Sequence, residues 1–342
     1  MEDVPKSSPV PRCHVGITYN LKKGVDSNVA DIEAEYDNIE TVWAIKKALE
    51  QYGCSVDLLE ADEYLPERLK KAKVDIIFNI AEGTYGRGRE AQVPALLNFY
   101  RIPFTGSDET TLCIALDKAL TKRLLSSYKV RTPKYKIISK ENQDWNTSFP
   151  FPAIVKPNAE GSSKGISDVA IVNTKEELKT LVQKNLAAYG QDMLVEEYIA
   201  GREFTVGVFG NGEEIHVFPP MEIVFINNQD LYNIYSYPVK QEYKKHVRYD
   251  CPALIDRGTE EEMVETAKKI YRVLACKDLA RMDFRLSNEG KLYFIEINPL
   301  PGLAPGYSDF PMLAQFSGMD YDSLVQNVLC SALKRHGLAS CL

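Results

Sequence analysis

The sequence predicts an α/β domain followed by two α+β domains, at 1–107, 108–201 and 202–342. The chain has 342 residues, more than one ordinary hydrophobic core accommodates. In its first third, strand-like and helix-like segments alternate, which is typical of a parallel sheet. After Arg202, strand-like segments follow one another closely, which favours an antiparallel sheet.

In the first domain we expect strands at 13–19, 55–61 and 74–80. The last is almost wholly apolar, so both of its faces should be buried. A helix capped by Asp37 or Asn38 should run to about Tyr52. The second helix of this domain should cover about 90–100.

The second domain should begin with one continuous helix over 108–130, because its apolar residues have helical spacing. Thr174 and Glu177 are spaced as a capping box for the next helix. The segments expected in this domain after the first helix are strands at 135–138, 153–157 and 192–199 and a helix at 174–185. Those expected in the third domain are strands at 203–210, 215–220 and 221–226, a helix at 259–275, a hairpin at 281–302 and a helix at 320–336.

Composition narrows the class of protein. The net charge of −7 argues against nucleic acid or an anionic membrane as the main partner. No segment is long and apolar enough to span a bilayer, and the N-terminus lacks a signal-peptide core. The seven cysteines form no C-x-x-C motif, which favours a reducing cytoplasm. The four histidines lie in no recognisable catalytic motif, so we expect chemistry based on carboxylates, lysines, arginines and backbone amides.

The hairpin RMDFRLSNEGKLYFIEINPLPG, residues 281–302, concentrates polar side chains on one face. Side chains two apart on a strand share a face, so Glu296 and Asn298 point together, and Asp283 lies in the partner strand. Such oxygens, with substrate phosphates, are typical ligands of Mg²⁺. The alternative is a polar outer face of an antiparallel hairpin. The constrained PLPG that follows is unusual for such a surface.

Two more motifs suit a nucleotide. In VKPNAEGSSKGIS, 155–167, a strand ends at Lys156 and small residues follow that let backbone N–H groups approach phosphates. The motif is not a P-loop, and an ordinary turn is the alternative. In LVEEYIAGREF, 194–204, backbone groups after the strand could bind an adenine edge and a carboxylate could bind ribose. Asp117 and Lys118 in ALDKALTK say little alone.

The order LDK…VKP…EGSSKG…VEEYIAGREF…YSYPVK…RMDF…FIEINPLPG resembles that of ATP-grasp enzymes, specifically the D-alanine–D-alanine ligase family. TGSD at 105–108 and DCPA at 250–253 match as well. The resemblance covers nearly the whole chain after the N-terminal arm and is weakest in the first third. It implies a three-domain ATP-grasp fold with ATP between the central and C-terminal domains.

The resemblance also implies roles for residues that match the family's motifs. Those implied to bind ATP are Lys118 and Lys156 at the phosphates, Glu160, Gly161, Ser162, Ser163 and Gly165 in the covering loop, Glu196, Glu197, Tyr198 and Ile199 at adenine, Glu203 at ribose and Lys240 at the γ-phosphate. Those implied to bind two Mg²⁺, with Mn²⁺ as an alternative ion, are Asp283, Glu296 and Asn298. Those implied to act on the amino acids are Arg281 and the Gly302 N–H at the oxyanion, Glu35 at the first ammonium, and Ser162 and Ser308.

The chain departs from the family around the amino acids. The family usually has a histidine-glycine loop after the third strand, whereas residues 79–92 read NIAEGTYGRGREAQ. Gln241 follows Lys240 where a tyrosine is common. Arg87, Arg89 and Glu90 could bind a substrate carboxylate or ammonium, or form a solvated charged loop.

We therefore expect an ATP-dependent ligase that joins a carboxylate to an amine through an acyl phosphate. The same chemistry on other amino-acid or hydroxy-acid substrates remains open. A nucleotide-binding module without catalysis is a rival, but every magnesium ligand and Arg281 are present. A dinucleotide-dependent oxidoreductase is excluded, because no G-x-G-x-x-G follows the first strand. The family is often dimeric, which leaves a homodimer open.

Overall fold

The computed structural model describes residues 13–24, 33, 35–143, 145, 149–161, 170–226, 232–235, 239–240 and 242–338. Among the predicted site residues, Ser162, Ser163, Gly165 and Gln241 lie outside the described residues. No helix in the described ranges is long and apolar enough to cross a membrane.

The first sheet is parallel and has the order β2-β1-β3. Its strands are β1 (His14–Tyr19), β2 (Ser55–Glu60) and β3 (Ile76–Asn79). Its helices are α1 (Ile39–Gln51), α2 (Leu65–Lys71), the 3₁₀ turn η1 (Arg89–Ala91) and α3 (Gln92–Tyr100). All of β3 is buried, as its apolar sequence predicts. Asn38 is the N-cap of α1, whereas α2 was not predicted.

The continuous helix expected over 108–130 is wrong. The segment forms α4 (Glu109–Leu116) and α5 (Lys118–Ser127), with Asp117 between them in an extended conformation. The Asp117 side chain accepts a hydrogen bond from the Leu120 N–H, which caps α5. This cap starts a new helix inside an unbroken apolar pattern, and it places Lys118 at the first position of α5.

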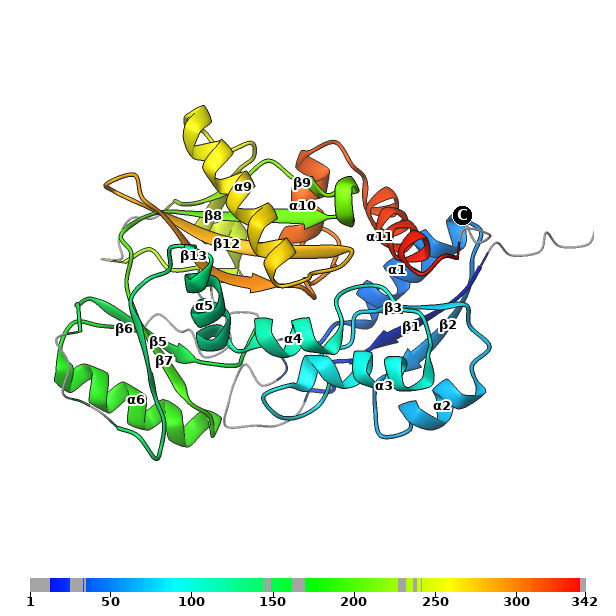
Figure 1. Cartoon of the computed structure of the whole chain (residues 1–342), viewed down its shortest axis with the longest axis horizontal. Helices are drawn as coiled ribbons and strands as arrows, with labels where there is room; N and C mark the ends of the chain where they lie inside the picture. The colour runs from blue at the N-terminus through cyan, green and yellow to red at the C-terminus, as the bar shows by residue number, and fades with distance from the viewer. Residues whose placement is uncertain are drawn as a thin grey trace, which may run out of the picture.

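The second sheet is antiparallel and has the order β4-β7-β5-β6. Its strands are β4 (Tyr135–Ile138), β5 (Ala153–Pro157), β6 (Ile171–Val172) and β7 (Met193–Glu197). Helix α6 (Lys175–Tyr189) packs along it, at the lower left of Figure 1. Thr174 caps α6 by accepting from the Glu177 N–H, as predicted.

The third sheet has the path β11-β10-β8-β12-β13, and β9 pairs with β8. Its strands are β8 (Gly201–Phe209), β9 (His216–Val217), β10 (Met221–Phe225), β11 (Val247–Asp250), β12 (Leu279–Ser287) and β13 (Leu292–Asn298). Figure 1 shows α9 (Arg257–Val273) across one face of this sheet. The short elements that accompany this sheet are η2 (Gly212–Glu214), α8 (Tyr243–His246) and α10 (Asp309–Phe316).

The last helix, α11 (Tyr321–Arg335), lies beside α1 (Figure 1). Val325, Leu329 and Leu333 of α11 are fully buried in one core with Ile45 and Leu49 of α1. The same core contains the first sheet and part of the third. The C-terminal helix therefore completes the hydrophobic core of the N-terminal sheet.

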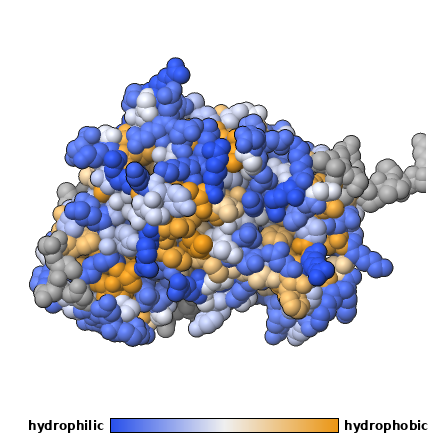
Figure 2. Space-filling view, viewed as in Figure 1, coloured by the Kyte–Doolittle hydropathy of each residue, from blue (hydrophilic) through white to orange (hydrophobic). Residues whose placement is uncertain are grey.

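On the face shown in Figure 2, hydrophobic residues gather near α4 and α5, between the more hydrophilic surfaces of α6 and α9. Helices α4 and α5 connect the first sheet to the second in the sequence. Lys118 and the buried Lys122 of α5 are therefore carried to the place where the sheets meet.

Candidate active site

The hairpin of β12 and β13 aligns four polar side chains. In the antiparallel register, Arg281 faces Asn298 and Asp283 faces Glu296, with a bulge directly after Asp283. Residues two apart on each strand share a face, so all four side chains project from the same side of the sheet. The alternation in the sequence predicted the grouping of Glu296 and Asn298 with Asp283 of the partner strand, whereas Arg281 was implied by the family resemblance.

Each carboxylate on this face lies close to a positively charged side chain. Arg281 lies 3.0 Å from Asp283 and Lys118 lies 3.6 Å from Glu296. Burial alone would raise the pKa of Glu296, but Lys118 and Lys156 lower it to about 2. Burial raises the pKa of Asp283, against the opposing effect of Arg281. Glu296 is thus ionised at neutral pH and surrounded by positive charge.

The carboxylates of the hairpin face supply only part of the ligands that a divalent cation needs. In the described part of the chain no group of three His, Cys, Asp or Glu side chains is placed to hold a metal ion. Two carboxylates and the Asn298 amide oxygen would leave further positions of an octahedral ion to phosphate oxygens and water. That incomplete set is typical of Mg²⁺ bound together with a nucleotide.

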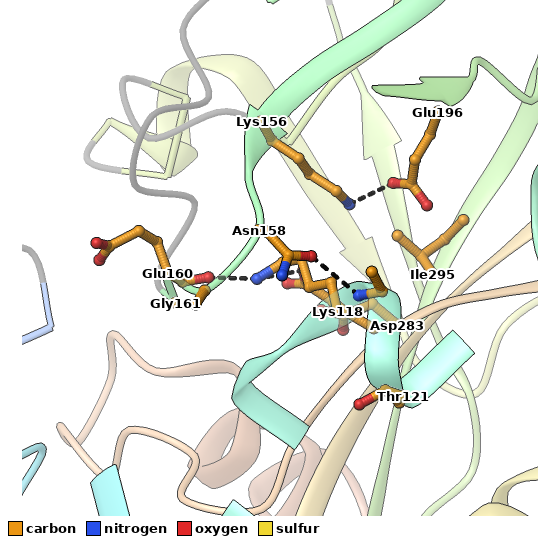
Figure 3. A network of polar contacts seen from close by, with 12 residues as sticks. Lys118, Thr121, Lys156, Asn158, Glu160, Gly161, Glu196, Asp283 and Ile295 are labelled. Carbon is orange, nitrogen blue, oxygen red and sulfur yellow. Dashed lines mark hydrogen bonds and ion pairs between the residues drawn. The ribbon is translucent and has the colours of Figure 1, made fainter. Parts of the chain in front are cut away.

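A cavity of about 80 Å³ collects most of the described residues predicted to bind the nucleotide, whereas Lys118, Glu160 and Gly161 line a smaller cavity. It is lined by Lys156, Glu196, Glu197, Tyr198, Ile199 and Glu203, and by Asp283 and Glu296 of the hairpin. Figure 3 shows Lys156 on β5 pointing to Glu196, 2.6 Å away, and Lys118 beside the backbone of Glu160. The structure therefore brings together residues that the sequence separates by well over a hundred positions.

Beside Glu203, this cavity contains a pair that sequence reasoning missed. Glu203 lies 3.0 Å from Arg285, which also stacks on the Tyr198 ring at 4.9 Å. Burial raises the pKa of Glu203 to about 7, although Arg285 acts to lower it. The alternation of β12 places Arg285 on the face of Asp283, which is a signal that could have identified it.

Lys122 is a second residue that was missed. It is fully buried, 2.8 Å from Glu196, and donates to the Ile295 carbonyl at 2.6 Å. Burial opposes the charge of Glu196, yet Lys122 and Lys156 hold its pKa below the usual value. Lys122 lies one helical turn after Lys118, within the apolar stripe of α5, which is an unusual place for a lysine unless it is paired. It thereby positions Glu196 and, through it, Lys156.

Lys122→Met should lower the free energy of unfolding by about 2–3 kcal/mol, because it leaves two buried acceptors, on Glu196 and Ile295, without this donor. Urea denaturation measures the change. Arg123→Met, on the exposed side of the same helix, is the matched control and should stay within about 0.5 kcal/mol of the parent. Equal stability of the two variants would contradict a structural role for Lys122.

A second cavity, of about 90 Å³, contains the residues predicted to act on the amino acids. It is lined by Glu35, Gly302 and Ser308, and it shares Arg281, Lys240 and no other described residue with the nucleotide cavity. A Cβ on Gly302 would lie 2.8 Å from the Ser308 Oγ, so any larger residue there would displace the Ser308 hydroxyl. The Gly302 loop and Ser308 are thus packed tightly together.

Asp309 contacts both residues that the two cavities share, and sequence reasoning missed it as well. Its buried carboxylate lies 3.3 Å from Lys240 and 3.4 Å from Arg281, and accepts from the Tyr235 hydroxyl at 3.2 Å. Burial opposes its ionisation, but Lys240 and Arg281 lower its pKa. Asp309 follows Ser308 in the first turn of α10, where an acid is favourable in any helix, so its position in the sequence gives no functional signal.

Glu35 contacts both Arg89, in the loop after β3, and Gly161, which follows β5. Arg89 Nε donates to its Oε2 at 3.0 Å, and Arg89 Nη2 donates to its Oε1. The Gly161 N–H also donates to Oε1, at 2.5 Å. Arg89 in turn donates to the Ala159 carbonyl at 2.8 Å and lies 3.1 Å from Glu160. Arg89 therefore holds Glu35 against the start of the predicted phosphate loop.

The other charged residues of the 82–90 loop are placed differently from one another. The Arg87 side chain is 72% exposed and lies 2.8 Å from Asp117. Glu90 is buried and lines a small cavity with Lys118, Glu296 and Asn298. Glu82 lines the cavity that contains Arg281 and Ser308. Neither Arg87 nor Arg89 lines that cavity, so the loop presents an acid there rather than a base.

A family model described as D-ala D-ala ligase C-terminus matches residues 124–330. The chain is 35% identical over 296 residues to a D-alanine--D-alanine ligase of Aquifex aeolicus, covering 85% of this chain and 94% of the relative. It is 31% identical over 325 residues to one of Carboxydothermus hydrogenoformans, covering 92% and 99%.

Solved structures agree on the fold. The crystal structure of the D-alanine--D-alanine ligase of Bacillus anthracis complexed with ATP has a TM-score of 0.75 at 21% identity, covering 95% of this chain and 99% of that chain. The predicted ATP-grasp fold is thereby confirmed. The chain belongs to the D-alanine–D-alanine ligase family, whose members are ATP-dependent ligases.

Proposed function

We propose that this protein is an ATP-dependent carboxylate–amine ligase that forms a dipeptide-type amide bond. The observation that carries the proposal is the pair of cavities joined at Arg281 and Lys240, one with nucleotide-site residues and one with amino-acid-site residues. A substrate carboxylate in the second cavity can attack the γ-phosphate of ATP in the first. The products of this step are an acyl phosphate and ADP. The amine of a second substrate then displaces phosphate through a tetrahedral intermediate.

The nucleotide residues have the roles implied by the family. Lys118, Lys156 and Lys240 neutralise phosphate charge, the 196–199 segment binds adenine, and Glu203 binds ribose. We propose two Mg²⁺ ions at Asp283, Glu296 and Asn298, with Mn²⁺ as a substitute. Such ions, when bound, neutralise charge on the transferred phosphoryl group. Ser162, Ser163 and Gly165 complete the phosphate loop in this proposal.

The acyl-transfer step depends on positive charge at the junction. Arg281 and the Gly302 N–H stabilise the oxyanion. Electrostatic stabilisation of this kind is usually the largest single contribution to the rate enhancement. Asp309 supports this role, because its carboxylate fixes both Arg281 and Lys240. Ser308 and Ser162 are the serines proposed to contact the amino-acid substrates. The three domains are proposed to divide near residues 107 and 201. No side-chain nucleophile is required.

We also propose a cytoplasmic homodimer, in line with the family. Light scattering coupled to size-exclusion chromatography gives the mass directly. A mass near 38.6 kDa at micromolar concentration would contradict the dimer.

D-alanine as sole amino acid should not give the highest kcat/KM. Glu82 adds a carboxylate to the cavity that contains the residues predicted to act on the amino acids. A polar group in a substrate pocket can alter substrate selection by orders of magnitude. We expect a clear preference for another amino-acid pair, or for a hydroxy acid as acceptor. The measurement is ADP release at saturating ATP with D- and L-amino acids, singly and in pairs, and with 2-hydroxy acids. If D-alanine alone proves best, the departures in the loop are neutral and the protein is a D-alanine–D-alanine ligase.

A further inference from the structure

The carboxylate of Glu35 has little capacity left for a substrate. Both of its oxygens accept hydrogen bonds from Arg89, and Oε1 also accepts from the Gly161 N–H. Its side chain is 5% exposed, and that of Arg89 is 8% exposed. A bidentate guanidinium pair of this kind is among the strongest protein hydrogen bonds. An incoming ammonium would have to share this carboxylate with three donors that the protein already supplies.

Glu82 is in the opposite situation. It lines the amino-acid cavity, yet it makes no hydrogen bond or ion pair with any residue that the structure describes. Burial raises its pKa well above the usual value, with further contributions from Glu90 and Glu35, and Arg89 only partly opposes them. A carboxylate held in this way gains strongly from a cation delivered by a ligand.

The third acid of the cavity, Asp37, differs from Glu82 in having a hydrogen-bond partner on the protein. Burial raises the pKa of Asp37 to about 7, against the opposing effects of Lys22 and of a hydrogen bond from Thr41. The same cavity offers Arg281 and Ser308 to a carboxylate. An α-amino acid has both groups that this arrangement requires, an ammonium for the acid and a carboxylate for the arginine.

We propose that Glu82 binds the ammonium of the first amino acid, and that Glu35 instead serves, with Arg89, to anchor the start of the phosphate loop at Gly161. This inference rests on the proposed ligase function and replaces the role that the family resemblance implies for Glu35. Glu82 thus selects an amino acid over the corresponding 2-hydroxy acid at this position. Glu35 acts on the nucleotide side as a positioning residue.

The test compares binding and turnover in Glu82→Gln and Glu35→Gln. The probes are the amino acid with the highest kcat/KM in the substrate panel and its 2-hydroxy counterpart. Calorimetric titration in the presence of a non-hydrolysable ATP analogue and Mg²⁺ measures their binding without turnover. Glu82→Gln should weaken amino-acid binding about 10- to 100-fold, the size of one lost charged hydrogen bond, and leave the hydroxy acid unchanged. Its KM for ATP should change less than 2-fold.

Glu35→Gln should show the converse pattern. We expect its KM for ATP to rise about 10-fold and its preference for the amino acid over the hydroxy acid to persist, because the neutral amide weakens the Arg89 contact. Glu82→Asp should restore part of the preference. Glu67→Gln, an exposed position on α2, is the matched control for a lost carboxylate in the same domain.

The outcomes separate the inference from the function on which it rests. If Glu82→Gln keeps the preference and Glu35→Gln loses it, Glu35 binds the ammonium and the inference is overturned, while the ligase assignment stands. If no amino acid in the panel binds or drives ADP release in the unaltered protein, the proposed function itself fails. Circular dichroism establishes that each variant is folded, and Glu82→Asp provides a second reading if Glu82→Gln is not.

Discussion

Glu296→Gln is expected to abolish ADP formation while leaving the fold intact. The substitution keeps the side-chain size but removes a charge that is present at neutral pH, because Lys118 and Lys156 hold the pKa of Glu296 at about 2. Its partner across the strand pair is Asp283. With one neutral member, this face loses a charged oxygen ligand for the ions that the phosphates require.

The measurement is ADP release over a range of Mg²⁺ concentrations, together with the melting temperature. Glu289→Gln, in the exposed turn of the same hairpin, is the matched control and should retain full activity. Near-normal turnover of Glu296→Gln at any Mg²⁺ concentration would remove Glu296 from the site. A large fall in melting temperature would show that the carboxylate is mainly structural.

Arg281→Lys is expected to lower kcat far more than it weakens ATP binding. The guanidinium contacts Asp283 and Asp309 at once, and an ammonium cannot reproduce that planar arrangement. Its proposed partner, the oxyanion, exists chiefly in the transition state. The fall in kcat should be about two to three orders of magnitude, which is typical of one lost oxyanion donor.

Arg285→Lys provides the contrast on the same strand. Arg285 lies in the nucleotide cavity beside Glu203, so its replacement should raise the KM for ATP and change kcat little. Steady-state kinetics of both variants, with ATP and the amino acid varied in turn, separates the two roles. An unchanged kcat with a raised KM for ATP in Arg281→Lys would assign Arg281 to ground-state binding.

Much of the site could be predicted because its signals are local. The period-two alternation of a strand placed Asp283, Glu296 and Asn298 on one face before any register was known. A strand ending in lysine, followed by small residues, indicated the phosphate loop. The order of these motifs along the chain then identified the family.

The remaining residues depend on distant partners. Lys122 and Asp309 gain their meaning from Glu196, Lys240 and Arg281, which the fold brings to them from other elements. The break at Asp117 depends on one capping bond that competes with an uninterrupted apolar pattern. The commitment of Glu35 to Arg89 likewise joins residues of two separate segments, and the motif that contains Glu35 gives no sign of it.

The packing of α11 on α1 has a consequence for the order of events during synthesis. The N-terminal strands leave the ribosome first, yet part of their core consists of Val325, Leu329 and Leu333, near the other end of the chain. Domains that are contiguous in sequence can fold as they emerge. Here the first sheet exposes an unfilled apolar surface until Tyr321–Arg335 has been synthesised, so a nascent chain stalled before residue 321 should be a strong substrate for chaperones.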